Sequence, residues 1–357
     1  MAGEVFGKDV QRLARRFVPL RLLLQGIEAL LLLLFLGVAA VLPPASASRL
    51  GATLFGCIGP RLGKSRHVRN NLRVVLDSIS SDPGACDPGP LPGSDQQRKS
   101  EGVRQSQETL GESRERQLAR LERGCWATLG AVLAEMPHLH RIGDLARQPP
   151  AVELALAPGA EDLLERLKGG EAFIFVTAHL ANWELLPRLL VQAGGRVAVI
   201  FTAQGNSFTD GLLQWLRRSE GVSYVGKRGG IRELLRAARA GQSLGLLVDL
   251  RSDEGEPISF FGRPAMTTTA PARLSLMGEI PMIPVRTERL GPARFRVTVE
   301  APIRPRQPKA SAQARARDMT EQLNDRFAEW IRARPQDWLC TKRRFPKERP
   351  PSGHGKA

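Results

Sequence analysis

The chain has few of the side chains that hold metal ions or build disulfide frameworks. Its 357 residues include four cysteines and five histidines. The cysteines are scattered, without the C-x-x-C spacing or nearby histidines of a zinc site, and are too few to staple a secreted scaffold. No nucleotide-binding glycine loop occurs either. We therefore expect reduced thiols, which suit the cytoplasmic side of a membrane, and a chemistry that needs neither a metal nor a cofactor.

Aromatic residues are also scarce, at 5% of the chain, and acidic residues are outnumbered by basic ones. The resulting net charge of +16 would attract nucleic acid, an anionic membrane surface or an acidic carrier protein. The basic residues are dispersed, and no zinc finger or RNA-binding motif accompanies them, so we expect no nucleic-acid partner. A non-enzymatic basic membrane or nucleic-acid binder stays open as the alternative.

An apolar run over residues 22–42 is long enough to cross a hydrocarbon core of roughly 30 Å as a helix. A cleaved signal peptide is the rival interpretation, because basic residues precede the run and Ala45, Ser46 and Ala47 follow it. The run is longer than a signal-peptide core, which favours a retained anchor over residues 1–48. A similar basic cluster follows the run, so a helix that dips into or lies in the interface fits the charges better than a simple crossing.

The rest of the chain divides by composition. We expect a helical entry segment over residues 49–77, a flexible insertion rich in Pro, Gly and Ser over 78–115, a catalytic domain over 116–346 and a loose tail over 347–357. Apolar periodicity predicts a helix over 118–139 and then alternating elements. The expected helices lie at 160–167, 183–193, 211–218, 230–240 and a final stretch of about twenty residues ending at 334; the expected strands lie at 172–177, 197–202, 222–225, 244–249, 282–287 and 295–299. This order predicts an α/β fold with a largely parallel central sheet flanked by helices.

The candidate chemistry lies where the strand at 172–177 ends. His179 follows the strand and Glu184 opens the next helix, at the edge where open α/β sheets place ligands. A neutral imidazole takes a proton from an alcohol near neutral pH when a carboxylate fixes its tautomer. The structural alternative is that Asn182 caps the helix, Glu184 complements its dipole and His179 merely ends a strand.

A second motif points to a different enzyme class. Residues 241–245 match the G-x-S-x-G elbow of serine esterases, with Ser243 as nucleophile. The elbow requires strand, turn and helix, whereas Ser243 follows a predicted helix and enters a strand. The remaining histidines have no partner at an interpretable spacing and are expected to be incidental: His67, His138, His140 and His354.

The segment from His179 to Glu184, His-Leu-Ala-Asn-Trp-Glu, resembles the H-x(4)-D/E motif of glycerolipid-type acyltransferases. Its form is that of the lipid A biosynthesis (lauroyl/myristoyl) acyltransferase family. Further segments are similar to that family in the same order: Arg69 to Arg73, Asn206 to Asp210 with Arg217, Leu246 to Asp249 followed by 258–265 with Arg263, and Trp330 to Trp338. Ser207 stands where the family usually has Pro, and Leu250 where Gln is common.

The resemblance implies transfer of a fatty acyl chain from an acyl-carrier-protein thioester to a hydroxyl of a lipid A precursor. His179 would be the base, and Glu184 would orient it. The further positions that the resemblance associates with substrate are Asn182, Trp183, Asn206, Arg217, Asp249 and Arg263, with a structural ion pair left open for Arg217 or Asp249. It also implies the cell inner membrane, with the catalytic domain on the cytoplasmic face. Another glycolipid or a phospholipid stays open as the acceptor.

Overall fold

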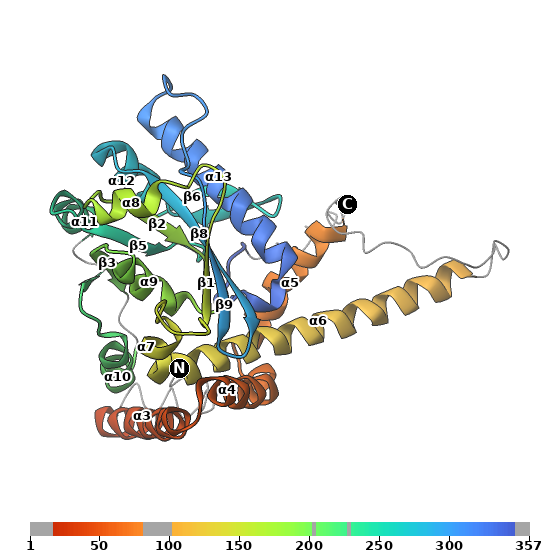
Figure 1. The fold of residues 1–357 in the computed structure, drawn as a ribbon. Coiled ribbons are helices and arrows are strands. Elements are labelled where there is room, and N and C mark those ends of the chain that lie inside the picture. Colours follow the sequence, from red (N-terminus) through yellow and green to blue (C-terminus); the bar gives the residue numbers. More distant parts are fainter. Residues whose placement is uncertain (1–16, 81–101, 202–204, 227–229, 347–357) are drawn as a thin grey trace.

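The structure, a computed structural model, describes residues 17–80, 102–201, 205–226 and 230–346 (Figure 1). The helices are α3 (Val18–Val41), α4 (Pro44–Ile58), α5 (Ser65–Ser80), α6 (Gly102–Glu135), α7 (Leu139–Ile142), α8 (Leu163–Lys168), α9 (Leu186–Gln192), α10 (Ser207–Arg217), α11 (Gly230–Arg239), α12 (Ala270–Gly278) and α13 (Ala312–Ala333). Short 3-10 turns at Met136–His138, Trp183–Leu185 and Pro335–Asp337 join some of them. The basic leader over 1–16, the middle of the expected insertion and the tail over 347–357 lie outside these residues.

A seven-stranded sheet forms the centre of the molecule, in the order β1-β9-β8-β2-β5-β3-β4. Its strands are β1 (Val152–Leu156), β2 (Ile174–Thr177), β3 (Val197–Phe201), β4 (Val222–Gly226), β5 (Ser243–Leu247), β8 (Met282–Gly291) and β9 (Arg294–Val299). Neighbours run parallel except β8 and β9, which form an antiparallel pair. This confirms the predicted α/β class. Strand β1 and the hairpin of β6 (Glu256–Phe260) and β7 (Arg263–Thr267) were not expected from the sequence.

Strand β2 shows why helices must cover both faces of the sheet. Side chains of β2 and of Phe173, which precedes it, alternate between two hydrophobic cores, with Ile174 and Val176 in one and Phe173 and Phe175 in the other. Helices α5, α11, α12 and α13 contribute to the first core, and α8 and α9 to the second. A strand buried on both faces appears in the sequence as a continuous apolar run, which is why the position of β2 was predictable.

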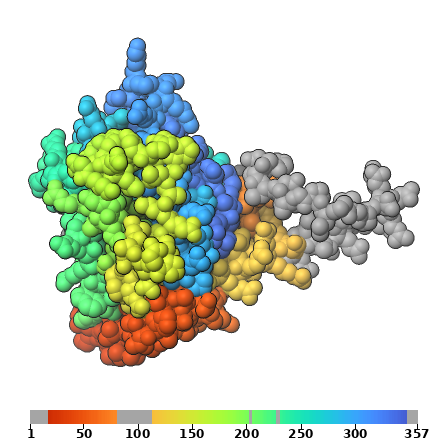
Figure 2. All heavy atoms as spheres, viewed as in Figure 1, coloured from red at the N-terminus to blue at the C-terminus, as the bar shows by residue number. Residues whose placement is uncertain are grey.

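Helices α3 and α4 form the base of the molecule, under the long helix α6 (Figures 1 and 2). Helix α4 crosses α6 at Gly51 and Gly130, where a Cβ on Gly51 would lie 2.2 Å from the carbonyl oxygen of Gly130. Two glycines in register therefore let the two backbones touch. Helix α5 runs to Ser80 and α6 starts at Gly102, so both ends of the expected insertion over 78–115 are helical, and residues 81–101 between them lie outside the described residues.

The end of the described chain returns to the central sheet. Helix α13 stops before Pro335, and the turn Pro335–Asp337 leads into Trp338, which is fully buried. Trp338 forms an antiparallel bridge with Leu180, and the N–H of Leu339 donates to the carbonyl oxygen of His179 at 2.9 Å. The last segment therefore braces the loop that follows β2.

Candidate active site

The parallel pairing of β2 and β5 brings His179 and Asp249 together. Thr177 and Leu247, the last residues of these strands, are register partners. His179 and Asp249 each lie two residues beyond them, so both side chains reach the same point at the carboxyl edge of the sheet. Open α/β sheets bind ligands at this edge.

The two side chains form a short hydrogen bond. Nδ1 of His179 lies 2.7 Å from Oδ1 of Asp249, which is completely buried, whereas the imidazole is 18% exposed. Because a carboxylate only accepts hydrogen bonds, Nδ1 carries a proton, and in the neutral imidazole the lone pair then lies on Nε2. The geometry thus fixes the tautomer that can act as a base.

Asp249 stays ionised despite its burial. Desolvation alone would raise the pKa of this carboxyl, but its attraction to the imidazolium form of His179 and the hydrogen bonds from His179 and Trp338 outweigh desolvation and bring the pKa below its ordinary value. The indole Nε1 of Trp338 donates to Oδ2 at 2.9 Å. Both carboxylate oxygens are therefore engaged, which holds Asp249 in one orientation toward the imidazole.

A buried arginine lies behind this pair. The side chain of Arg344 is 1% exposed and donates to the carbonyl oxygen of Met266 at 2.7 Å and to the hydroxyl of Thr267 at 2.6 Å. Its guanidinium also lies 4.9 Å from the ring centre of Phe260. Burial lowers the pKa of Arg344 to about 10, while the negative charge of Asp249 acts in the opposite direction. Arg344 thus supplies a positive charge close to Asp249.

The loop between β2 and the next helix is held by polar side chains. Ala181 adopts the left-handed backbone conformation, with φ of 48°. Asn182 caps the following turn by accepting the N–H of Glu184 at 3.2 Å, and its amide donates to the buried carboxylate of Glu135 at 2.8 Å. Arg289 pairs with the same carboxylate. Asn182 therefore has the capping role that the structural alternative assigned to it.

Glu184 pairs with Arg217 at the end of α10. Nε of Arg217 donates to one carboxylate oxygen at 2.8 Å, and Nη2 donates to the other at 2.6 Å. Burial would lower the pKa of Arg217, but Glu184 raises it above its ordinary value. Trp183 connects this pair to the catalytic histidine candidate: its Nε1 donates to Glu184 at 3.2 Å, and its ring meets that of His179 edge-on with centres 5.1 Å apart.

The carboxylate partner of the imidazole therefore differs from the sequence-based expectation. Glu184 was expected to orient His179, but Nδ1 of His179 bonds to Asp249, while both oxygens of Glu184 bind Arg217. The two candidates left open as ion-pair residues, Arg217 and Asp249, each bond to a side chain of the H-x(4)-E segment. Sequence reasoning did not single out Arg344 or Glu135.

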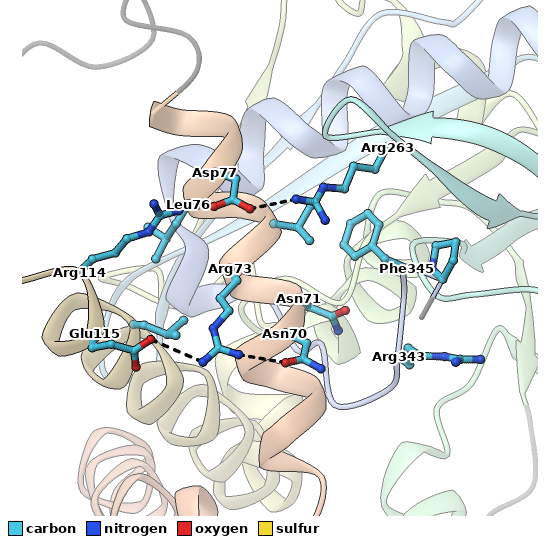
Figure 3. A pocket seen from close by; sticks show the side chains of 13 residues that line it. Asn70, Asn71, Arg73, Leu76, Asp77, Arg114, Glu115, Arg263, Arg343 and Phe345 are labelled. Atoms are coloured by element: carbon cyan, nitrogen blue, oxygen red, sulfur yellow. Dashed lines mark hydrogen bonds and ion pairs between the residues drawn. The ribbon is translucent and has the colours of Figure 1, made fainter. Parts of the chain in front are cut away.

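Two other expected substrate positions lie elsewhere. Asn206 caps α10 and its amide donates to the backbone carbonyl of Gln25 and to Glu28 of α3, both at 2.9 Å. Arg263 pairs with Asp77 of α5 at 3.0 Å, on the wall of a separate cavity of about 530 Å³ (Figure 3). Neither His179 nor Asp249 lines that cavity, which also holds Arg73, Arg114 and Arg343.

The serine esterase interpretation finds no support in the geometry. Ser243 is 1% exposed and begins β5, and its hydroxyl accepts the backbone N–H of Phe173 at 3.1 Å. This hydroxyl is buried and accepts a backbone hydrogen bond within the sheet, so it does not occupy the exposed position of the nucleophile in a G-x-S-x-G motif.

Comparison with known proteins places the chain in a family. No curated protein matches it. The family model described as bacterial lipid A biosynthesis acyltransferase matches residues 107–347, which include His179, Glu184, Arg217 and Asp249. The match covers more than half of the chain and every strand of the sheet. The chain therefore belongs to the bacterial lipid A biosynthesis acyltransferases.

Proposed function

We propose that the protein transfers a fatty acyl chain from an acyl-carrier-protein thioester to a hydroxyl of a lipid A precursor. The observation that carries this proposal is the 2.7 Å contact between His179 Nδ1 and the buried Asp249, at the carboxyl edge of a parallel sheet. An imidazole oriented by a buried carboxylate is the arrangement that general-base catalysis at an alcohol requires.

In the proposed reaction the acceptor hydroxyl gives its proton to Nε2 of His179 while its oxygen attacks the thioester carbonyl. The tetrahedral intermediate then collapses and the bond between carbon and sulfur breaks. The leaving thiolate takes the proton from Nε2 of the imidazolium, which restores the neutral imidazole. Asp249 stabilises the transient imidazolium through Nδ1. Atoms and charges balance without a covalent enzyme intermediate or a metal ion.

The oxyanion of the intermediate needs hydrogen-bond donors. The backbone N–H of Trp183 donates to no other described residue, and Trp183 lies beside His179. We assign this N–H as one oxyanion donor. Because Glu184 accepts from the indole of Trp183 and is itself held by Arg217, Glu184 acts as a positioning residue for this donor.

The family and the charge support the proposed acceptor and cellular site. A net charge of +16 suits both an acidic carrier protein and the anionic inner membrane, with the catalytic domain on its cytoplasmic face. An acyltransferase of the same mechanism acting on another glycolipid or a phospholipid is the second candidate. The basic surface alone would also suit a non-enzymatic binder, which would leave His179 and Asp249 without a use.

The test is mass spectrometry of a lipid A precursor incubated with detergent-purified protein and acyl carrier protein charged with different fatty acids. We expect a gain of one acyl mass, lost in His179→Ala and strongly reduced in Asp249→Asn. Circular dichroism and thermal unfolding establish that each variant is folded. A matched control is His140→Ala, which changes an exposed histidine outside the site.

Each outcome discriminates between the candidates. No gain with any donor, but a gain when a phospholipid or another glycolipid replaces the precursor, would move the proposal to that acceptor. An undiminished gain in His179→Ala would overturn the mechanism. Salt-sensitive binding to nucleic acid without any acyl transfer would favour the non-enzymatic binder.

A further inference from the structure

Helix α3 is attached to the catalytic domain along its length. Its buried residues, Glu28, Leu32, Leu36 and Ala39, recur every three or four positions and so form one stripe. Hydrogen bonds fix both ends of this stripe. Near the start, Gln25 and Glu28 bind the loop at 205–206, and near the end the buried His138 donates to the carbonyl oxygen of Ala39 at 2.9 Å.

This attachment covers most of the helix. From Gln25 to Ala39 the helix axis advances about 21 Å, at 1.5 Å per residue. The elements packed beside it are α10, α4, α6 and the turn Met136–His138 (Figure 1). Helix α3 is therefore a part of the domain surface and not a free rod that leaves the domain.

The opposite side of α3 is apolar and exposed, and α4 and α10, which pack beside α3, also expose large apolar residues. On α4, three large apolar residues spaced four apart are exposed, and on α10 two exposed aromatic residues lie seven apart. We call the following set the lipid face: Leu23, Leu30, Leu31, Leu34, Val38 and Val41 of α3, Leu50, Leu54 and Ile58 of α4, and Phe208 and Trp215 of α10. Large apolar side chains exposed on three helices that pack together indicate a membrane or protein contact.

Charge decides between a crossing helix and one that lies flat. If α3 crossed the bilayer, the elements packed along it would enter the hydrocarbon as well. Directly after the turn Met136–His138, His140 and Arg141 are exposed, and an arginine in the hydrocarbon core is strongly unfavourable. A flat orientation avoids this cost and leaves Arg21 and Arg49, which are exposed on α3 and α4, at the level of anionic headgroups.

We propose that the lipid face docks the protein on one leaflet of an anionic bilayer, with α3 in the plane of the membrane and not across it. Phe208 and Trp215 extend this contact to α10, whose last residue is Arg217. The contacts of Asn206 with α3 link α10 to the embedded helix. The catalytic pair thus lies at a membrane-bound edge of the domain, and this inference holds whatever lipid is acylated.

The first experiment measures depth along α3. The full chain with Cys57→Ser and Cys86→Ser keeps Cys125 and Cys340, which are buried. Single cysteines introduced as Leu23→Cys, Leu31→Cys, Leu34→Cys and Val41→Cys carry a fluorophore and are bound to vesicles of phosphatidylethanolamine and phosphatidylglycerol. Nitroxides at shallow or deep lipid positions quench the fluorophore, and Met277→Cys, 64% exposed on α12, is the matched control.

For a flat helix the ratio of shallow to deep quenching stays within about twofold over the four positions, because all lie at one depth in a leaflet. A crossing helix places Leu31 near the bilayer centre, and its ratio then falls about fivefold or more below those of Leu23 and Val41. That second pattern would overturn the proposal. Absence of quenching at all four positions would also overturn the proposal, because it would show that the lipid face does not contact the bilayer.

A second measurement reports sidedness. In sealed vesicles with protein added from outside, Arg21→Cys and Arg49→Cys should both react with a membrane-impermeant maleimide, since a flat α3 keeps both on one side. Protection of either one would contradict this orientation. The double change Leu31→Asp and Leu34→Asp should weaken vesicle binding at least about tenfold, whereas Met277→Asp should not. Neither assay uses acyl transfer, so failure of the proposed enzymatic function leaves this test intact.

Discussion

The surroundings of single residues support the chemistry proposed at the edge of the sheet. Asp249 is completely buried, yet its two oxygens each accept a hydrogen bond and its negative charge faces His179. Replacing the acid by its amide keeps the shape and removes the charge. It also allows the wrong tautomer of the imidazole, with the proton on Nε2.

We therefore expect Asp249→Asn to lower kcat by about 10²–10⁴-fold while changing KM little, because general-base catalysis and tautomer control are lost together. Steady-state kinetics with an acyl-carrier-protein thioester measures this. Asp253→Asn is the control, since Asp253 is 83% exposed and pairs only with Arg251 among the described residues. A kcat within about threefold of the wild type for Asp249→Asn would argue against its role in orienting His179.

The same carboxyl makes stability sensitive to acid. Its pKa is lower in the folded protein than the reference value of about 3.9. A depressed folded pKa contributes stability that is present above the unfolded pKa and is lost as the pH falls through the folded pKa. The difference in unfolding free energy between wild type and Asp249→Asn should shrink as the pH falls below about pH 4. Urea unfolding in detergent at a series of pH values measures it, and a gap that widens in acid would contradict the sign.

At the scale of elements, two contacts hold α10 and α4 in place. Arg217 at the end of α10 is the bidentate partner of Glu184 in the turn after β2, and the side chains are 23% and 11% exposed. Gly51 of α4 touches Gly130 of α6. Each contact joins segments far apart in the sequence, and each can be tested with a matched control.

Removal of one partner from the first contact should leave a largely buried charge without compensation. We expect Arg217→Met to cost about 2–3 kcal/mol of unfolding free energy, somewhat below fully buried pairs, and Arg217→Met with Glu184→Gln to recover part of it. Denaturant unfolding of the four proteins gives the coupling. The exposed pair Arg166 and Glu171, treated in the same way, should show at most about 1 kcal/mol. Equal coupling free energies for both pairs would show that the burial of Arg217 and Glu184 does not strengthen their interaction.

The helix crossing gives a steric prediction. In Gly51→Ala the new Cβ meets the Gly130 carbonyl at 2.2 Å, so α4 must move, at a cost of about 1–3 kcal/mol. Gly56→Ala in the same helix places its Cβ 3.4 Å from the nearest heavy atom, on Ala127, and should be neutral or stabilising by up to about 1 kcal/mol. Thermal unfolding compares the two. Equal melting temperatures for both variants would show that the helices separate without cost.

Several elements could be predicted because local sequence determines them. Strands β2 and β5 are apolar runs, and Pro335 fixes the end of α13. Strand β1 was missed because it pairs with β9, more than a hundred residues later, and Val152 is the one fully buried residue among its five. Its identity depends on a partner that no local pattern reveals.

For the whole molecule, charge predicts how substrates arrive. With a net charge of +16, association with an acidic carrier protein should be steered electrostatically. We expect kcat/KM for the carrier-bound donor to fall by about tenfold between 50 and 500 mM salt, with kcat nearly constant. A short acyl thioester without the carrier protein is the control and should show little change. A salt-independent kcat/KM for the carrier-bound donor would show that electrostatic steering does not assist its association.

The same scale explains which parts of the site were predictable. His179, Glu184, Arg217 and Asp249 were all singled out from the sequence, but not which carboxylate meets which base. The separation of His179 from Asp249 is 70 residues, and that of Glu184 from Arg217 is 33. The register of β2 on β5 and the placement of α10 decide these pairings, and both exist only in the folded protein.

The burial of one side of α3 has a practical consequence for preparing the enzyme. Deleting the apolar helix is the usual way to obtain a water-soluble version of an anchored protein. Here that truncation would uncover the core residues packed against Leu32 and Leu36, and would take away the partners of Asn206 and His138. A soluble version is better sought by replacing outward-facing leucines of α3 with polar residues while the helix itself is kept.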